Sequence, residues 1–204
     1  MNKSRKIGVF GGTFNPVHNG HIRLAQLYYD KLNLDKLLVI PTNIPPHKSV
    51  SNMADSGDRL NMLKIAFEPF PYVDVSDIEL KNGGKSYTVN TISQLKELYP
   101  DDRLYLIVGG DMFLCFDRWK EYKKILSMCK VCAAPREIGE FKALKEYQKK
   151  IDPTLSNTII LDAEVLVLSS TEIREKIADI DKANYLIPEK VRQYIIQKGL
   201  YKND

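Results

Sequence analysis

Short apolar runs alternate with longer segments of helical periodicity, and this alternation constrains the fold more than any other feature of the chain. The runs are rich in Val, Ile and Leu and carry no regular polar positions. Strands that are apolar on both faces are typical of a parallel sheet covered by helices on both sides. The sequence therefore predicts the α/β class. The predicted strands are 6–11, 36–41, 72–75, 103–109, 130–134 and 158–162.

The segments between the strands repeat their apolar residues at helical spacing. The predicted helices are 19–33, 57–68, 87–99, 119–127, 140–150, 169–179 and 188–198. Ser169 or Ser170 can cap the helix that starts near Thr171, Pro188 suits a first helical turn, and Gly199 suits the position after a helix. No repeat, low-complexity tract or linker divides the chain. We expect one Rossmann-like, doubly wound domain over 1–204, with a small C-terminal helical part.

The charge balance favours a protein that binds small anions. The formal net charge is +4, which is too low to indicate a nucleic-acid-binding protein. Residues 1–50 carry seven Lys and Arg against two Asp, so the excess lies near the N-terminus. No apolar stretch is long enough for a membrane span, and MNKSRKIGVF lacks the apolar segment of a signal peptide. We expect a cytoplasmic protein with no membrane or nucleic-acid partner.

The three cysteines do not form a disulfide framework. Cys129 and Cys132 form a C-x-x-C pair, but a zinc site would need a second pair or histidines at ligand spacing. A redox motif would lie between a strand and a helix start, whereas this pair spans the start of the apolar run VCAA. The sequence predicts buried thiols in a reducing compartment.

Four unusual clusters come directly after predicted strands. GGTFNPVHNGH follows the first strand, PTNIPPHK the second, GGDMF the strand at 103–109, and LSSTEIR comes after the last one. In open parallel sheets, ligands bind beyond the carboxyl ends of the strands, where the strand order reverses. We therefore expect the chemistry of the protein at this edge of the sheet.

The first cluster is a glycine-rich turn that lacks the motifs of the common nucleotide-binding loops. G-x-G-x-x-G is absent, and Asn19-Gly20-His21 stands where a P-loop has Gly-Lys-Ser/Thr. Gly11 and Gly12 still let the backbone approach a ligand closely. The first N–H groups of the following helix would point at an anion.

His18 and His21 lie three residues apart at the start of that helix and share one face. They could be zinc ligands, although no third ligand is evident nearby. They could be structural residues that cap the helix or fill space. They could also donate to phosphate oxygens and stabilise charge that grows on a pentacoordinate phosphorus, and the residues favour this third use.

The second and last clusters each allow a structural and a functional interpretation. The prolines of PTNIPPHK stiffen a loop that presents His47 and Lys48 outward, but proline-rich loops are common. LSSTEIR can be a well-capped amphipathic helix. Alternatively, its hydroxyl and N–H groups bind phosphate, with Arg174 one turn along on the same side.

Together, GGTFNPVHNGH and SSTEIR resemble the H-x-G-H nucleotidyltransferase superfamily, which transfers a nucleotidyl group from ATP or CTP to a phosphate or carboxylate. Within it, the chain is similar to the bacterial nicotinate-nucleotide adenylyltransferases through PTNIPPHK, SYTVNT, VGGDMF, RWKEY and YIIQKGLY. Asn15 stands where many relatives have Asp, which leaves one charge fewer near the phosphates, and Leu168 stands where Ile is usual.

The resemblance implies an enzyme of NAD biosynthesis that converts ATP and nicotinate mononucleotide to deamido-NAD and pyrophosphate. It implies Mg²⁺ bound mainly through the ATP phosphates, with no dedicated protein ligand, and is compatible with a homo-oligomer. It gives catalytic roles to His18, His21 and Arg174. The residues implied for ATP are Gly11, Thr13, Phe14, His18, His21, Gly109, Asp111, Ser169, Ser170, Thr171 and Arg174. Those implied for the mononucleotide are Gly12, Thr13, His47, Lys48, Thr88 and Trp119.

Other interpretations share part of this pattern. Phosphopantetheine adenylyltransferases and cytidylyltransferases resemble the first and last motifs but lack the PPHK, SYT and RWK segments. An enzyme that prefers the amide mononucleotide and a sensor without catalysis remain open, although the intact histidines argue against the sensor. An aminoacyl-tRNA synthetase fragment would carry a K-M-S-K-S-like segment, which is absent.

Overall fold

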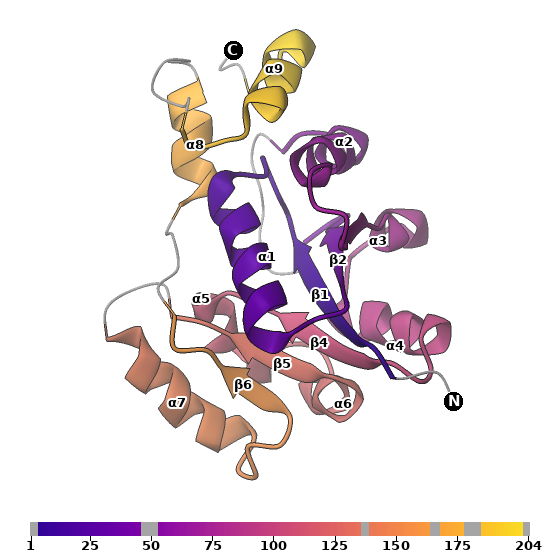
Figure 1. Cartoon of the computed structure of the whole chain (residues 1–204), viewed down its shortest axis with the longest axis vertical. Coiled ribbons are helices and arrows are strands. Elements are labelled where there is room, and N and C mark those ends of the chain that lie inside the picture. Colours follow the sequence, from indigo (N-terminus) through magenta and orange to yellow (C-terminus); the bar gives the residue numbers. More distant parts are fainter. Residues whose placement is uncertain (1–3, 46–52, 136–138, 164–167, 178–184, 202–204) are drawn as a thin grey trace.

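A computed structural model describes residues 4–45, 53–135, 139–163, 168–177 and 185–201, and it has the predicted α/β architecture (Figure 1). Six parallel strands form one sheet in the order β3-β2-β1-β4-β5-β6. The strands are β1 (Lys6–Gly12), β2 (Lys36–Pro41), β3 (Val73–Val75), β4 (Arg103–Ile107), β5 (Lys130–Ala133) and β6 (Thr158–Ile160). The strand order reverses between β1 and β4, so their carboxyl ends flank the crevice that such sheets offer to ligands.

Helices cover both faces of the sheet, as expected for a doubly wound fold. One face carries α1 (Asn19–Leu32), α2 (Ser56–Phe67), α8 (Ser170–Ile177) and α9 (Glu189–Lys198). The other face carries α3 (Ile78–Asn82), α4 (Thr88–Leu98), α5 (Gly110–Phe113), the 3₁₀ turn η1 (Phe116–Arg118), α6 (Tyr122–Met128) and α7 (Glu140–Ile151). No helix in these described ranges is long and apolar enough to cross a bilayer.

The central strands are almost entirely apolar because they supply both cores, whereas the edge strand β3 carries the exposed Asp74 and supplies one core through Val73 and Val75. Val9 and Leu38 pack with the helices of one face, whereas Phe10 and Val39 pack with those of the other. Successive side chains of a strand point to opposite sides of a sheet, so a strand covered on both sides needs an apolar residue at every position. The apolar runs from which the strands were predicted therefore supply residues to both hydrophobic cores.

The predicted elements agree with the structure except around Trp119. All six strands lie within two residues of their predicted bounds. The predicted helix 119–127 is wrong at its start, because Trp119 has an extended backbone and Glu121 is left-handed (φ 53°), so α6 begins at Tyr122. The short helices α3, α5 and η1 were not predicted, since segments of this length show no helical period.

The C-x-x-C pair consists of buried thiols, as predicted. Cys129 is 7% exposed and Cys132 is fully buried, and neither forms a disulfide. Burial raises the pKa of Cys129 to about 12 and also raises the pKa of Cys132. Thiols that stay protonated are poor nucleophiles and metal ligands, so these two residues serve the core.

Candidate active site

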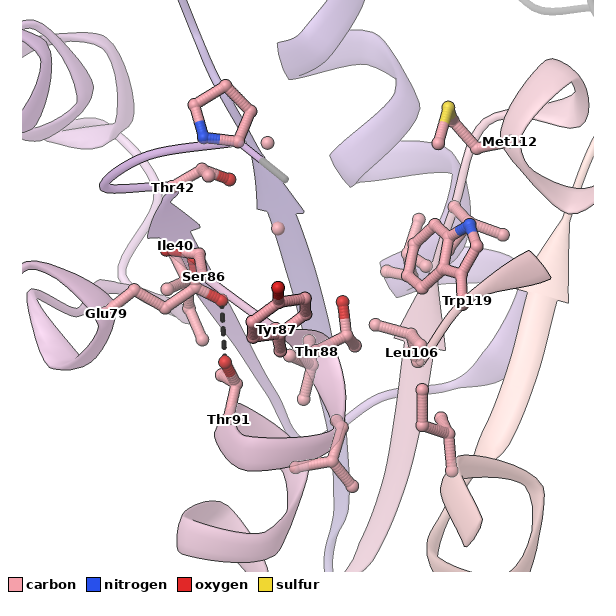
Figure 2. Close-up of a pocket in the computed structure, with 18 of the residues that line it drawn as sticks. Ile40, Thr42, Glu79, Ser86, Tyr87, Thr88, Thr91, Leu106, Met112 and Trp119 are labelled. Carbon is pink, nitrogen blue, oxygen red and sulfur yellow. Dashed lines mark hydrogen bonds between the residues drawn. The ribbon is translucent and has the colours of Figure 1, made fainter. Parts of the chain in front are cut away.

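A pocket with a cavity volume of about 200 Å³ lies at the carboxyl ends of β1 and β4 (Figure 2). Gly11, Gly12 and Thr13 line it after β1, and Gly109 lines it after β4. Thr88 closes it from the start of α4. These residues are far apart in the sequence and were all predicted for substrates. The crevice at the reversal of strand order thus brings them together.

Trp119 forms the wall of the pocket opposite Glu79 and Ser86 (Figure 2). Its indole is half-buried and packs on the ring of Phe116, with the ring centroids 5.1 Å apart. Phe116 is fully buried, so the indole rests on a fixed support. A supported aromatic wall can stack on a planar ring of a ligand.

The segment before α4 is held against the loop that follows β2. The Asn43 N–H donates to Oγ of Ser86 (2.9 Å), and the Asn43 side-chain amide donates to the Gly84 carbonyl (3.0 Å). The Ser86 N–H in turn donates to the Ile44 carbonyl (3.0 Å). These bonds fix the main chain just before Thr88, where the open N–H groups of a helix start can receive an anion.

Glu79 is a buried carboxyl in the same wall of the pocket, although sequence analysis did not single it out. It is 8% exposed and accepts a hydrogen bond from the Thr91 hydroxyl (2.7 Å). Burial raises the pKa of Glu79 above its ordinary value, because the charged form loses its hydration. Glu79 thus places a carboxyl with a raised pKa in the wall of the pocket.

His18 and His21 form a reciprocal cap at the start of α1. The His21 N–H donates to Nδ1 of His18, and the His18 N–H donates to Nδ1 of His21, both at 3.3 Å. The two rings stack with their centroids 3.6 Å apart. A ring whose Nδ1 accepts a hydrogen bond carries its proton on Nε2 when neutral, so the cap sets the tautomer of both rings. The capping role and the donor role weighed for these histidines are thus compatible.

Phe14 packs against the histidine pair through its contact with His21. Its ring is 2% exposed and meets the His21 ring edge-on, with the centroids 4.9 Å apart. Its backbone is left-handed (φ 46°), which is unusual for an aromatic residue. A Cβ on Gly12 would come within 3.0 Å of the same ring. Phe14 therefore offers a ligand its main chain and not its side chain.

The late SSTEIR motif docks on the loop that precedes the histidines. The Ser170 hydroxyl donates to the Pro16 carbonyl (3.2 Å), and Nη1 of Arg174 donates to the Asn15 carbonyl (2.8 Å). Nη2 of Arg174 also donates to Oγ1 of Thr171 (3.2 Å), which holds the guanidinium over the first turn of α8. Figure 1 shows α8 at the end of α1 that is nearest the carboxyl end of β1.

Ser169 caps α8, as predicted, because its Oγ accepts from the Thr171 N–H (3.3 Å). The helix starts of α1 and α8 therefore meet at one loop. Their positive ends and the Arg174 side chain make this a suitable place for phosphate.

Asn15, the departure from the family pattern, is a buried junction. It is 2% exposed, and its Oδ1 accepts from the Ala54 N–H (3.0 Å) and from the Tyr201 hydroxyl (2.7 Å). Its side chain thus joins the first loop to two distant segments. Within the described contacts, the residue acts through these hydrogen bonds and its packing.

The remaining predicted residues fall in different surroundings. Gly109 precedes α5, and Asp111, the second residue of α5, is exposed and stands in the sequence between Gly109 and Met112, which line the pocket. His47 and Lys48 lie outside the described residues.

Sequence analysis missed Arg59, Thr42, Glu79 and Tyr87. Thr42 stands within the quoted PTNIPPHK and Tyr87 within SYTVNT, but Arg59 and Glu79 carried no signal of their own.

A family model described as cytidylyltransferase-like matches residues 9–176 of the chain. A probable nicotinate-nucleotide adenylyltransferase of Desulfitobacterium hafniense (strain Y51) is 38% identical over 97% of this chain and 96% of its own length. A protein of the same name from Clostridium novyi (strain NT) is 37% identical over 97% of this chain and 100% of its own length.

Two solved structures of Plasmodium falciparum nicotinic acid mononucleotide adenylyltransferase share the fold. The complex with NaAD has a TM-score of 0.79 at 19% identity, and the complex with APC has 0.76 at 18%. Each alignment covers 97% of both chains. The family match and the identity to its curated members agree with the pocket and the paired helix starts. The chain belongs to the cytidylyltransferase-like family and, within it, to the nicotinate-nucleotide adenylyltransferases.

Proposed function

We propose that the chain transfers the adenylyl group of ATP to nicotinate mononucleotide, which gives deamido-NAD and pyrophosphate. The names of its curated relatives support this activity. The observation that carries it is the loop after β1, which lines the pocket through Gly12 and Thr13, leads into the start of α1 and holds the start of α8 through Asn15 and Pro16. One short loop thus adjoins a place for a planar ring and a place for phosphates.

The reaction needs no general base. The 5′-phosphate of the mononucleotide is already an anion, and one of its oxygens attacks the α-phosphorus of ATP in line. A new P–O bond forms while the bond from the α-phosphorus to the bridging oxygen breaks, and pyrophosphate takes the electron pair. Catalysis then depends on the placement of the two substrates and on stabilisation of the negative charge that builds up between them.

In this proposal the paired helix starts bind ATP. His18 and His21 donate from Nε2 to oxygens of the transferring phosphoryl group. Arg174, with N–H groups and hydroxyls of the Ser169–Thr171 segment, stabilises the departing pyrophosphate. The proposed ATP residues also include the main chain at Gly11, Thr13 and Phe14, together with Gly109 and Asp111 on the adenosine side.

The pocket receives the mononucleotide. Trp119 stacks on the pyridine ring, and Thr88 with neighbouring N–H groups receives the nicotinate carboxylate. Gly12 and Thr13 lie beside its phosphate, and His47 and Lys48 complete that contact. The names of the curated relatives support the acid as substrate over the amide.

Mg²⁺ fits this site as an ion carried by the substrate. Among the described residues, no three His, Cys, Asp or Glu side chains are grouped so as to hold a metal ion. Mg²⁺ commonly keeps several waters and binds substrate phosphates, so a site with few carboxylates suits it. When bound, it would offset charge on the triphosphate, while His18, His21 and Arg174 orient the phosphates.

A pyrophosphate-release assay with ATP and separate acceptors tests the proposal. The expected result is turnover with nicotinate mononucleotide, slower turnover with the amide mononucleotide and none with phosphopantetheine. Turnover with phosphopantetheine or a preference for the amide would contradict the assignment. Binding of ATP without release of pyrophosphate with any acceptor would indicate a sensor instead.

A further inference from the structure

Arg59 of α2 is one of the largest fully buried side chains, with 1% of its surface exposed. Its guanidinium donates to four main-chain carbonyls: Nε to Ala54 (3.1 Å), Nη1 to Thr13 (3.0 Å) and Thr42 (2.6 Å), and Nη2 to Asn43 (3.3 Å). None of the ion pairs in the described part of the chain includes Arg59. The residue is a buried cation that binds loops.

Burial of a cation without a carboxylate partner is costly, and it lowers the pKa of Arg59. The planar guanidinium of Arg59 has five N–H donors and can bind several carbonyls at fixed angles, which the ammonium group of a lysine could not do. Nη1 alone joins Thr13 after β1 to Thr42 after β2. The Thr42 N–H also donates to the Gly12 carbonyl (2.8 Å), so these two pocket loops are held edge to edge.

The connection continues to the far wall of the pocket through Asn43. Nη2 of Arg59 binds the carbonyl of Asn43, whose side-chain amide binds Gly84 and whose N–H binds Ser86. Ser86 lies two residues before Thr88. A single buried side chain is thus linked to both loops and, through one more residue, to the start of α4.

We propose that Arg59 and Asn43 form a positioning frame that sets the distance between the two substrates. The inference rests on the proposed function, in which the Thr13 loop serves both phosphates and the Thr88 segment serves the mononucleotide. In-line attack requires the two reacting atoms about 3–3.5 Å apart, and a misplacement of about 1 Å can cost on the order of 100-fold in rate. Loss of the frame should therefore lower kcat more than it weakens the binding of ATP or of the mononucleotide.

Arg59→Lys tests the frame because it keeps the charge and removes the fork. Arg5→Lys is the matched control. Nε and Nη2 of Arg5 both bind Asp102, and this contact joins the amino ends of β1 and β4, far from the carboxyl ends that form the pocket. Thermal unfolding gives the folded fraction. Steady-state kinetics give kcat and both KM values, and a titration gives the Kd of ATP alone.

For Arg59→Lys we expect kcat per folded molecule to fall on the order of 10- to 100-fold with the Kd of ATP unchanged, and no change for Arg5→Lys. A kcat equal to that of the wild type would overturn the proposal. So would a Kd of ATP that rises by the same factor as kcat/KM falls, because Arg59 would then serve ATP binding.

Asn43→Ala provides a second test that spares the buried cation, in case Arg59→Lys does not fold. It removes the link to Gly84 and leaves the carbonyl that Arg59 binds. We expect a lower kcat with an unchanged KM for ATP, whereas unchanged kinetics would refute the frame. Lack of turnover in the wild type would contradict the proposed function, while an effect confined to the variants addresses the frame alone.

Discussion

The capping and donor roles of His18 can be separated by two amide substitutions. The side-chain oxygen of Asn reaches roughly the place of Nδ1, and the amide nitrogen of Gln reaches roughly that of Nε2. His18→Asn therefore keeps an acceptor for the His21 N–H, which lies 3.3 Å from Nδ1 in the wild type, but has nothing at Nε2. His18→Gln keeps a donor near Nε2 and loses the cap. Both variants lose the stacked ring, so that loss cancels in the comparison.

The magnitudes follow from these contacts. Loss of one donor to transition-state charge costs about 3 kcal/mol, or roughly 100- to 1,000-fold in kcat. Loss of an N-cap costs about 1 kcal/mol, or about 2–4 °C in Tm for a chain of this size. We expect His18→Asn to have the lower kcat and His18→Gln the lower Tm, by these amounts.

Pyrophosphate release at saturating substrates and thermal unfolding in the same buffer measure the two effects. The Asn substitution is itself the control for folding, because Asn is a favourable N-cap residue. If kcat per folded molecule is the same in both variants, His18 is a cap and the donor role is refuted. If the Tm order is reversed, the reciprocal cap is not what stabilises the start of α1.

Three further predictions address the pocket and the core. Trp119→Ala should raise the KM of the mononucleotide about tenfold, with a smaller rise for Trp119→Phe, whereas a rise only in the KM of ATP would assign the ring to the other substrate. Glu79 has a raised pKa, so the folded state holds this proton more tightly than the unfolded chain, and stability declines as pH rises above 4.5, the ordinary value. The Tm of Glu79→Gln relative to the wild type should therefore rise between that pH and neutrality, and a constant difference contradicts this. Iodoacetamide should label half-buried Cys115 in the native protein but Cys129 and Cys132 only after unfolding, as read by mass spectrometry; native labelling of either buried thiol argues against their burial.

The sheet could be predicted from the sequence because its central strands need apolar residues on both faces, and such residues form recognisable runs. A strand such as β1 must be apolar on both sides, and no other part of an α/β fold shows such short unbroken runs. The start of α6 could not be predicted, because Lys120 and Glu121 suit a helix, whereas in the structure Trp119 has an extended backbone and packs on Phe116. Tertiary contact overrides local preference there.

The candidate site divides in the same way. His18, His21 and Arg174 could be singled out as candidates because they stand in or beside the first turn of a helix, next to glycine or hydroxyl residues. Arg59 could not be found, because an arginine in an amphipathic helix is normally exposed and its partners are carbonyls that every residue has. Glu79 was missed for a related reason, since a glutamate is normally exposed and only the fold buries this one.

The junction at Asn15 has a consequence for the order of events during synthesis. Arg174 and Tyr201 bind this residue across sequence separations of 159 and 186. The sheet between β1 and β5 can collapse while the chain is still growing, as early segments of a domain do. The contact between Asn15 and Tyr201, however, cannot form until residue 201 has left the ribosome. A nascent chain can therefore acquire its core before this junction closes, so that truncated products can be compact and yet lack it.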